Sequence, residues 1–351
     1  MSVGIIVPLP AYTLNPAFIA RKAEALGFES IWYHEHPILP VDSASPFPAT
    51  GGEIPWTYRH FSEPYISLAM AAAVTSKIKL ATGITLVIER NPLILAKEIA
   101  VLDLHSHGRF IFGVGAGWNR EETTLMGGDF EHRWTQAREA VMALKALWTQ
   151  DEAEFHGRYY NFPPVYCYPK PAQKPHPPVL LGGNAPNVLQ RVARYADGWL
   201  PNRITPHQVE ASRLRLDTLA TAQGRDPASV SISVFGQPPD TTRAQVEAFL
   251  NAGARNVIAG LWEADDDATA ELMDEFYARL SNGSNPATAL RRAKLKLLKS
   301  GGRTRPPYYW ASMSLFTRDS ELGLSDRNLA AAGYAPKTDL VRARLQAGRR
   351  K

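Results

Sequence analysis

The sequence predicts a TIM barrel, a closed (β/α)8 fold of the α/β class, on two observations. Short apolar segments of the kind buried in parallel sheets alternate with segments of helical periodicity, and the pair recurs eight times within residues 1–280. A doubly wound open sheet, the rival fold, would require an early G-x-G-x-x-G motif. The nearest candidate begins at Gly113 and fails, because Trp118 occupies its last position.

Eight segments are predicted to be strands because each is short, apolar or β-branched, and bounded by turn residues. They cover residues 3–8, 30–33, 79–87, 110–114, 179–181, 198–201, 230–235 and 256–261. The helices predicted between and after them cover residues 15–26, 63–75, 93–104, 134–150, 187–196, 207–223, 243–252 and 268–280. Residues 152–171 interrupt the alternation and predict an inserted hairpin with a connector.

Residues 79–122 carry the clearest local signals. Gly83 lies inside a strand, where glycine usually marks a bulge or a close approach by another group. Asn91 is suited to the N-cap of the following helix and Pro92 to its first turn, while Gly108 is suited to the C′ position. Glycines 113, 115 and 117 lie at and just beyond the end of the wholly apolar strand predicted over residues 110–114. They predict either a place where the backbone approaches a ligand or tight packing at the barrel rim.

Composition limits the kind of protein this can be. Hydrophobic residues make up 45% of the chain, which suffices for a large core. Cys167 is the single cysteine, which rules out an internal disulfide and favours a reducing compartment. The first residues lack the basic and long apolar parts of a signal peptide, and no apolar run approaches the roughly 20 residues of a membrane span. We therefore expect a cytoplasmic protein without a membrane partner.

Positive charge is concentrated in the last part of the chain. The formal net charge is +5, but residues 281–351 contain 15 Lys and Arg against 4 Asp and Glu. Because the remainder is acidic, the composition does not favour a nucleic-acid partner. We expect a barrel over residues 1–280 and a basic, partly disordered extension over residues 281–351. Within the extension, residues 291–299 predict an amphipathic basic helix with Leu295 and Leu298 packed inward.

The chain resembles the luciferase-like flavin and deazaflavin oxidoreductases in several ordered motifs. These are ALGFESIWYHEH, SPFPATGG, LATGITLVIERNPLILAKEIAVLDLHSHGRFIFGVGAGWNREE, FHGRYYNF, PKPAQKPHPPVLLGGNAPNVLQRVARYADGWLP and SVFG. The resemblance covers about residues 1–240 and is strongest to the branch that uses coenzyme F420. It implies hydride transfer with F420 to or from a small organic substrate, in a homodimer. The alternatives are an FMN-dependent monooxygenase served by a separate flavin reductase, and a non-catalytic fusion or interaction protein.

The resemblance places the cofactor at the carboxyl ends of the strands. It implies that His36 is the catalytic residue, which hydrogen-bonds the reacting centre or acts as a base. It also implies a non-prolyl cis peptide bond between Gly83 and Ile84 that backs the ring. The implied cofactor-binding residues are Thr82, Gly83, Ile84, Gly115, Asn119, Gly182, Gly183 and Asn184.

These residues are implied to contact different parts of the cofactor. Asn119 matches a residue at the polar edge of the ring, and residues 182–184, which precede a helix, match the phosphate site. Backbone N–H groups at a helix N-terminus favour anions on physical grounds alone. Ala116 stands where the sugar-phosphate dehydrogenases of the family carry an acid, which argues against that reaction.

Residues 37–61 form a long loop rich in proline, glycine and aromatic residues, which predicts a lid. In this lid, Trp56, Arg59 and His60 either bind substrate or cover the rim. His34 is expected to point to the opposite side of the strand from His36. His105 and His107 do not share a helix face, so no metal site is expected.

Residues 252–319 resemble a second family, the end of CHAT domains, which are caspase-like peptidase modules. The catalytic His and Cys of that family lie upstream of the matching segment, so no peptidase activity follows. By pattern alone, residues 256–280 are an adequate last strand and helix for a barrel.

Overall fold

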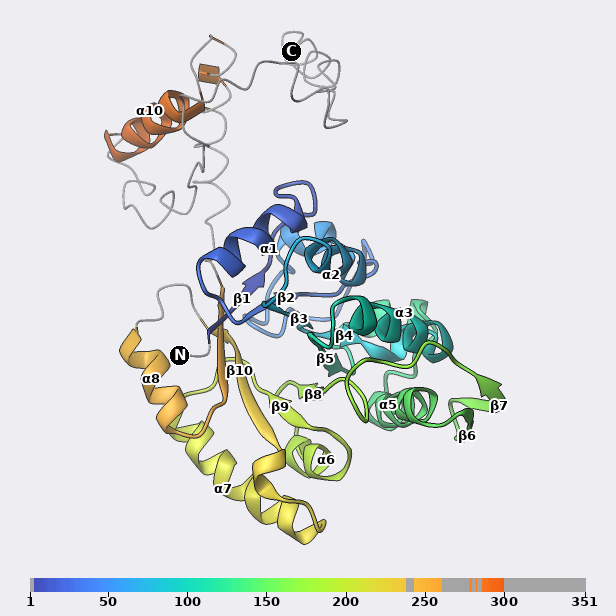
Figure 1. Cartoon of the computed structure of the whole chain (residues 1–351). Helices are drawn as coiled ribbons and strands as arrows, with labels where there is room; N and C mark the ends of the chain where they lie inside the picture. The colour runs from blue at the N-terminus through green and yellow to red at the C-terminus, as the bar shows by residue number, and fades with distance from the viewer. Residues whose placement is uncertain are drawn as a thin grey trace. The chain divides into compact units, whose positions relative to one another are not determined.

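The computed structural model describes residues 3–237, 243–260, 275, 278–279, 282 and 286–299. The chain divides into two units, Met1–Glu263 and Ala264–Lys351, which are described separately. In the first unit, parallel strands form a closed ring with helices on the outside (Figure 1). The strands of the ring are β1 (Val3–Val7), β2 (Ser30–Tyr33), β3 (Lys79–Thr82), β5 (Phe110–Gly115), β8 (Val179–Gly182), β9 (Gly198–Leu200), β10 (Ser231–Gln237) and β11 (Asn256–Gly260).

The ring closes because every one of these strands pairs with two neighbours. The order is β1, β2, β3, β5, β8, β9, β10 and β11, and β11 returns to β1 with Val257 opposite Val3. The predicted TIM barrel is therefore confirmed. The eighth strand comes from residues 256–260, so the segment that resembles a CHAT domain contributes it. Of the helix expected over residues 268–280, most lies outside the described residues.

The third strand is made in two pieces. After β3 the strand is interrupted at Gly83 and resumes as β4 (Thr85–Leu86), and both pieces pair with β5. The interruption predicted at Gly83 is confirmed, and the Gly83–Ile84 peptide bond is cis, as the resemblance implied. The strand ends earlier than residue 87, because a 3-10 turn, η2 (Val87–Glu89), follows it.

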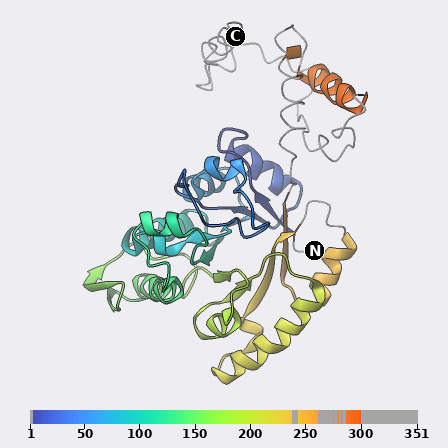
Figure 2. The ribbon, with the colours of Figure 1, turned by 180° about the vertical axis from the view of Figure 1, so that it is seen from behind.

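Helices cover the outside of the barrel (Figures 1 and 2). They are α1 (Pro16–Ala25), α2 (Pro64–Ala72), α3 (Pro92–His105), α5 (Arg133–Thr149), α6 (Val188–Tyr195), α7 (Pro206–Ala222) and α8 (Arg243–Asn251), with the short α4 (Arg120–Leu125) after β5. The predicted start of α3 is confirmed, since the Asn91 side chain accepts a hydrogen bond from the N–H of Leu93 at 2.9 Å.

The end of α3 differs from the prediction by one residue. His107, with φ at 58°, occupies the left-handed C′ position, and Gly108 follows it at C″. The N–H of Gly108 donates to the carbonyl of Asp103 and that of His107 to the carbonyl of Leu104, which is the Schellman pattern. A glycine next to the true C′ residue misled the prediction.

The inserted hairpin is confirmed as β6 (Glu152–His156) paired antiparallel with β7 (Asn161–Tyr166). It projects from the barrel beside α5 (Figures 1 and 2). The connector that returns the chain to β8 is tied down by the fully buried Asp103, whose carboxylate accepts from the backbone N–H of Gln173 at 2.9 Å and from its amide at 2.7 Å. The insertion therefore leaves the barrel order intact.

Two apolar clusters hold this unit together. The larger one fills the space between the strands and the surrounding helices. The smaller one lies inside the barrel and consists of Ile6, Trp32, Ala81, Leu180, Leu200 and Phe235. None of the described helices is long and apolar enough to cross a membrane.

The second unit is described mainly through one helix, α10 (Pro286–Lys299). The predicted basic helix is confirmed and begins five residues earlier than expected. Among the α10 side chains that the structure describes, Ala289 and Ala293 are buried, whereas Leu295 is 41% exposed, so the inward packing of Leu295 was wrongly predicted. The side chain of Leu298 and the disorder expected in residues 281–351 lie outside what the structure describes.

Candidate functional site

The carboxyl ends of the strands bring the residues singled out from the sequence to one mouth of the barrel. His36 follows β2, Ile84 follows β3, Asn119 follows β5 and Asn184 follows β8. In a (β/α)8 barrel this is the end at which ligands bind. The structure therefore collects the predicted residues on the expected face, and their contacts decide what each can do.

His36 is paired with a carboxyl group that sequence reasoning missed. Its Nδ1 lies 2.7 Å from Oε2 of Glu122, and the two side chains are only 6% and 1% exposed. Glu122 lies in the first turn of α4, where its backbone N–H donates to the Asn119 side chain at 3.0 Å. The signal that could have found it is Asn119 followed three residues later by Glu, which is typical of a helix start.

Burial determines the protonation of this pair. Burial lowers the pKa of His36 to about 4, against the opposing charge of Glu35, and raises the pKa of Glu122 to about 8. At neutral pH the Glu122 carboxyl group is therefore protonated, and His36 is a neutral imidazole. With Nδ1 accepting from the Glu122 carboxyl group, Nε2 carries the ring proton. His36 can thus donate a hydrogen bond from Nε2 into the site.

A second buried acid, Glu89, lies near the pair. Its Oε1 accepts from the Thr123 hydroxyl at 2.8 Å, and the residue is 5% exposed. Burial, and next the charge of Glu122, raise the pKa of Glu89 to about 8. Glu89 Oε2 and Glu122 Oε1 have no hydrogen-bond partner among the described residues. Both acids are therefore neutral at pH 7, and each keeps one oxygen for a further partner.

Glu89 should make stability depend on pH. Its pKa rises from 4.5 in the unfolded chain to about 8 in the folded one, so the folded state binds the proton more tightly. The resulting stabilisation is complete below pH 4.5 and is lost as the pH rises through 8. Burial lowers the pKa values of His34 and His36 to about 4, so they oppose this trend only below about pH 6.5.

We therefore predict that Glu89→Gln makes stability fall less steeply between pH 6.5 and 8, where Glu122, with its pKa also raised to about 8, still contributes to the fall. Relative to the variant, the wild-type protein should lose about 1.4 kcal/mol in free energy of unfolding for each pH unit. Urea unfolding at closely spaced pH values measures this difference. Parallel profiles for the two proteins would show that Glu89 ionises normally in the folded state.

The lid, residues 37–61, packs aromatic rings around His36. The centroid of the His36 ring lies 5.2 Å from that of Tyr58, 5.6 Å from that of Trp118, which follows β5, and 6.2 Å from that of Phe61. Phe47 extends the cluster and lies 5.1 Å from Tyr58 and 5.9 Å from Trp118. The surroundings of His36 are therefore aromatic, and Tyr58 and Phe61 are lid residues that the sequence did not single out.

The structure contradicts the prediction that His34 points to the opposite side of the strand from His36. Its ring stacks on Phe61 at 5.2 Å and meets Phe235 edge-on at 5.8 Å. Phe61 is thus a shared neighbour of His34 and His36. The prediction was wrong because residues two apart along an extended chain lie on the same face, so His34 and His36 share a side and His34 does not oppose His36.

The residues predicted to bind substrate form a different group in the lid. Trp56, Arg59 and His60 lie in the 3-10 turn η1 (Trp56–His60). The His60 ring contacts Trp56 at 5.3 Å and Tyr12 at 5.5 Å, and Trp56 and Arg59 are exposed. These contacts are made among rim residues. That Trp56, Arg59 and His60 bind substrate stays a prediction.

Most of the glycines that were predicted to bind the cofactor leave room for neighbouring side chains of the protein itself. A Cβ on Gly115 would lie 1.7 Å from Ile84 Cδ1, and one on Gly182 would lie 2.7 Å from Ile84 Cγ2. The two glycines thus accommodate the Ile84 side chain, which supports the tight-packing interpretation for Gly115. Thr82 is also engaged, because its hydroxyl donates to the Gly113 carbonyl at 2.9 Å.

Gly183 differs from these glycines. Its φ is +91°, and no described atom lies within 4 Å of the position that a Cβ would take. It is followed by Asn184, whose amide donates to the Asn202 carbonyl at 2.6 Å, and then by α6 from Val188. The Gly183 N–H donates to the Leu200 carbonyl at 3.1 Å, so the empty space lies beside its Cα, and phosphate binding by this loop stays a prediction.

Asn119 is occupied by the protein itself. Its side-chain oxygen caps α4, its amide nitrogen donates to the Ser43 hydroxyl at 3.1 Å, and the residue is buried. It therefore fixes the loop after β5 against the lid. Contact with a cofactor ring stays a prediction for this residue.

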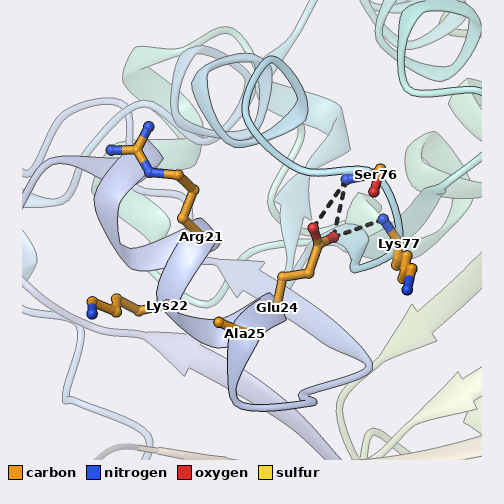
Figure 3. A pocket seen from close by; sticks show the side chains of 6 residues that line it. All are labelled: Arg21, Lys22, Glu24, Ala25, Ser76 and Lys77. Atoms are coloured by element: carbon orange, nitrogen blue, oxygen red, sulfur yellow. Dashed lines mark hydrogen bonds between the residues drawn. The ribbon is translucent and has the colours of Figure 1, made fainter.

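Two surface hollows lie at the opposite, amino ends of the strands. One lies between α1 and the start of β3, and Figure 3 shows the residues that line it, Arg21, Lys22, Glu24, Ala25, Ser76 and Lys77. Glu24 accepts from the backbone N–H groups of Ser76 at 3.0 Å and Lys77 at 2.6 Å, which fixes the turn before β3. The other hollow lies at the starts of β10 and β11. In the described part of the chain, no three His, Cys, Asp or Glu side chains gather as a metal site requires.

Comparison with known proteins agrees with this architecture. The sequence matches the Luciferase-like monooxygenase family over residues 17–307, which includes most of the segment that resembles a CHAT domain. An uncharacterized protein of Mycobacterium tuberculosis is 38% identical over 290 residues, which make up 80% of this chain and 99% of that protein. A solved structure, the coenzyme F420 dependent tetrahydromethanopterin reductase of Methanopyrus kandleri, shares the fold with a TM-score of 0.60 at 22% identity, and the match covers 74% of this chain and 92% of that one.

Two more relatives are named for the cofactors they use. The F420-dependent glucose-6-phosphate dehydrogenase of Amycolatopsis mediterranei is 30% identical over 188 residues, 52% of this chain and 51% of that protein. The FMNH(2)-dependent dimethylsulfone monooxygenase of Pseudomonas putida is 31% identical over 172 residues, 48% of this chain and 46% of that protein. The extent of the match with the family decides the assignment: this chain belongs to the luciferase-like monooxygenase family.

Proposed function

We propose that the protein is an F420-dependent oxidoreductase that transfers hydride to or from a small organic substrate at the carboxyl end of the barrel. The observation that carries the proposal is the His36–Glu122 pair, buried beneath the aromatic lid at the end of β2. A group that can hold and pass a proton in a dry site is what hydride chemistry on a C–OH or C–N centre requires.

The residues at the mouth suit a flavin-type ring. Tyr58, Phe61 and Trp118 supply aromatic faces, and Ile84 supplies an apolar one. Glu122 Oε1 and Glu89 Oε2 are buried oxygens that lack a partner within the described chain. F420 supplies the two-electron redox chemistry when it is bound. The protein's own share is to position the ring, exclude water and control one proton at His36.

An anionic tail is accommodated by the loop after β8. The space beside the Cα of Gly183 is empty, and the chain enters α6 only a few residues later, although the Gly183 N–H itself donates to the Leu200 carbonyl at 3.1 Å. Backbone N–H groups at the start of a helix attract anions. We therefore assign the phosphate of the cofactor to this loop and the ring to the region of Ile84 and His36.

The second candidate is an FMN-dependent monooxygenase that receives reduced flavin from a separate reductase. It is favoured by the likeness to the dimethylsulfone monooxygenase. A non-catalytic fusion protein has less support, because the feature that would favour it, an open barrel near residue 250, is not found. In that region β11 pairs with both β10 and β1. Ala116 still argues against glucose 6-phosphate as the substrate.

Titration of the purified protein with F420 and with FMN, followed by ring fluorescence, tests the proposal. We expect saturable quenching by F420 and weaker binding of FMN. Tighter binding of FMN, with oxygen consumed on addition of a reductase, would favour the monooxygenase. Binding of neither cofactor would overturn both candidates.

A further inference from the structure

The lid is joined to the loop after β5 by a compact set of hydrogen bonds, which we call the latch. The Glu121 carboxylate accepts from the Ser45 hydroxyl at 2.7 Å, the Ser43 hydroxyl at 3.1 Å and the Ala44 N–H at 3.1 Å. In return, the N–H of Arg120 donates to the Ser45 hydroxyl at 3.0 Å. The Asn119 amide adds a bond to the Ser43 hydroxyl.

The latch lies next to the aromatic cover of His36 on both sides. Trp118 immediately precedes residues 119–121, which form the β5 side of the latch. Phe47 follows residues 43–45, which form the lid side, by two positions. Phe47 packs on Trp118, and Trp118 packs on His36. Opening the latch therefore frees Phe47 to leave Tyr58 and Trp118, two of the rings that contact His36.

The rest of the lid has different attachments. At its far end, the Ala11 N–H donates to the His60 carbonyl at 2.7 Å, and Phe61 forms a bridge with Pro10. Between the two ends, the N–H groups of Thr50 and Gly51 bond back to the Phe47 carbonyl, which makes a local turn. That turn is tied outward through Arg203, which donates to the Ala49 carbonyl at 2.8 Å.

We propose that Glu121 is a positioning residue that latches the lid shut over His36, so that access to His36 requires release of residues 43–45. The carboxylate holds a permanent charge in this role, because hydrogen bonds, that of Ser45 first, lower the pKa of Glu121 to about 2. The latch is therefore released by motion of the lid and stays insensitive to physiological pH.

The test measures how fast His36 is acylated by diethylpyrocarbonate in the protein without cofactor. Peptide mapping gives the rate at His36 relative to His207, whose side chain is 91% exposed and serves as the internal reference. We expect Glu121→Ala to raise this ratio at least tenfold. Ser45→Ala opens the latch from the lid side and should raise it in the same direction, whereas Glu154→Ala, on the hairpin, should not.

Hydrogen exchange supplies a second readout that a general loss of structure would not mimic. The amides of Ala44 and Arg120 should exchange faster in Glu121→Ala, while the Ala11 amide, bonded to the other end of the lid, should keep its rate. Glu121→Gln retains one acceptor oxygen and should give intermediate values. An unchanged His36 ratio in both latch variants would overturn the proposal, as would equal acceleration of all three amides. Both measurements need no cofactor, so they stand whether or not F420 binds.

Discussion

Replacing Arg90 by methionine should lower the free energy of unfolding by about 3–5 kcal/mol. The Arg90 guanidinium forms an ion pair with Glu35, whose side chain is 1% exposed, and its Nε donates to Glu35 Oε1 at 2.5 Å. Burial raises the pKa of Glu35, and the charge of Arg90 opposes that rise. Without Arg90, the folded protein must keep an unpaired charge or take up a proton, and either outcome costs stability.

Double mutants separate this pair from the other contacts of Arg90. Arg90 also pairs with Glu63 at 2.5 Å and lies 4.7 Å from the centre of the Tyr65 ring. Glu63 is half exposed, so Glu63→Gln should cost less than about 1 kcal/mol. Adding Glu35→Gln to Arg90→Met should restore part of the loss, because the buried charge is then gone. Urea unfolding measures the free energy of unfolding of the wild type, the two single variants and the double mutant. A loss below 1 kcal/mol for Arg90→Met would contradict the argument.

The Arg90–Glu35 pair also supports the site. Glu35 stands between His34 and His36, and its second oxygen accepts from the backbone N–H of Leu86 at 2.6 Å. One carboxylate therefore joins the end of β2 to β4, the second piece of the third strand. The His-Glu-His sequence drew attention to its histidines, but the central glutamate fixes where they lie.

Much of the fold could be predicted because its signals are local. Short apolar strands, Asn91 before Pro92 and the glycine inside the third strand are readable from adjacent residues. The helix α4 escaped prediction because six residues are too few to show a period. The position of His107 in the left-handed region escaped for another reason, since a neighbouring glycine is the more usual choice.

The candidate site could be predicted only in part, because its contacts join residues that are distant in the chain. His36 was found from its place at a strand end together with the family resemblance, but its partner Glu122 lies 86 residues away. The glycines at 115 and 182 showed where backbone is exposed to close approach. Only the structure shows that the approaching group is the Ile84 side chain. Pairing across the barrel mouth is set by the fold and leaves no mark in the local sequence.

His36→Ala should lower turnover by about 10²–10⁴-fold while changing cofactor affinity by no more than a few-fold. The imidazole contributes a proton-carrying group, whereas the aromatic faces of Tyr58, Phe61 and Trp118 remain in the variant. His36→Asn keeps a polar side chain beside Glu122 but cannot carry a proton, so it should be as slow as His36→Ala. Steady-state kinetics with fluorescence titration of the cofactor separates the two quantities. An unchanged rate would remove His36 from the catalytic role, and recovery in His36→Asn would reduce that role to positioning.

The pH profile shows which partner of the pair limits the rate. Below about pH 4 His36 takes up a second proton, and above about pH 8 Glu122 loses the one that the pair shares. Turnover should therefore fall on both sides of a plateau between these values. Glu122→Gln cannot ionise, so it should abolish the alkaline fall and leave the acid one. If the alkaline fall persists in Glu122→Gln, ionisation of Glu122 does not cause it, and Glu89, whose pKa is also raised to about 8, is the group to replace next.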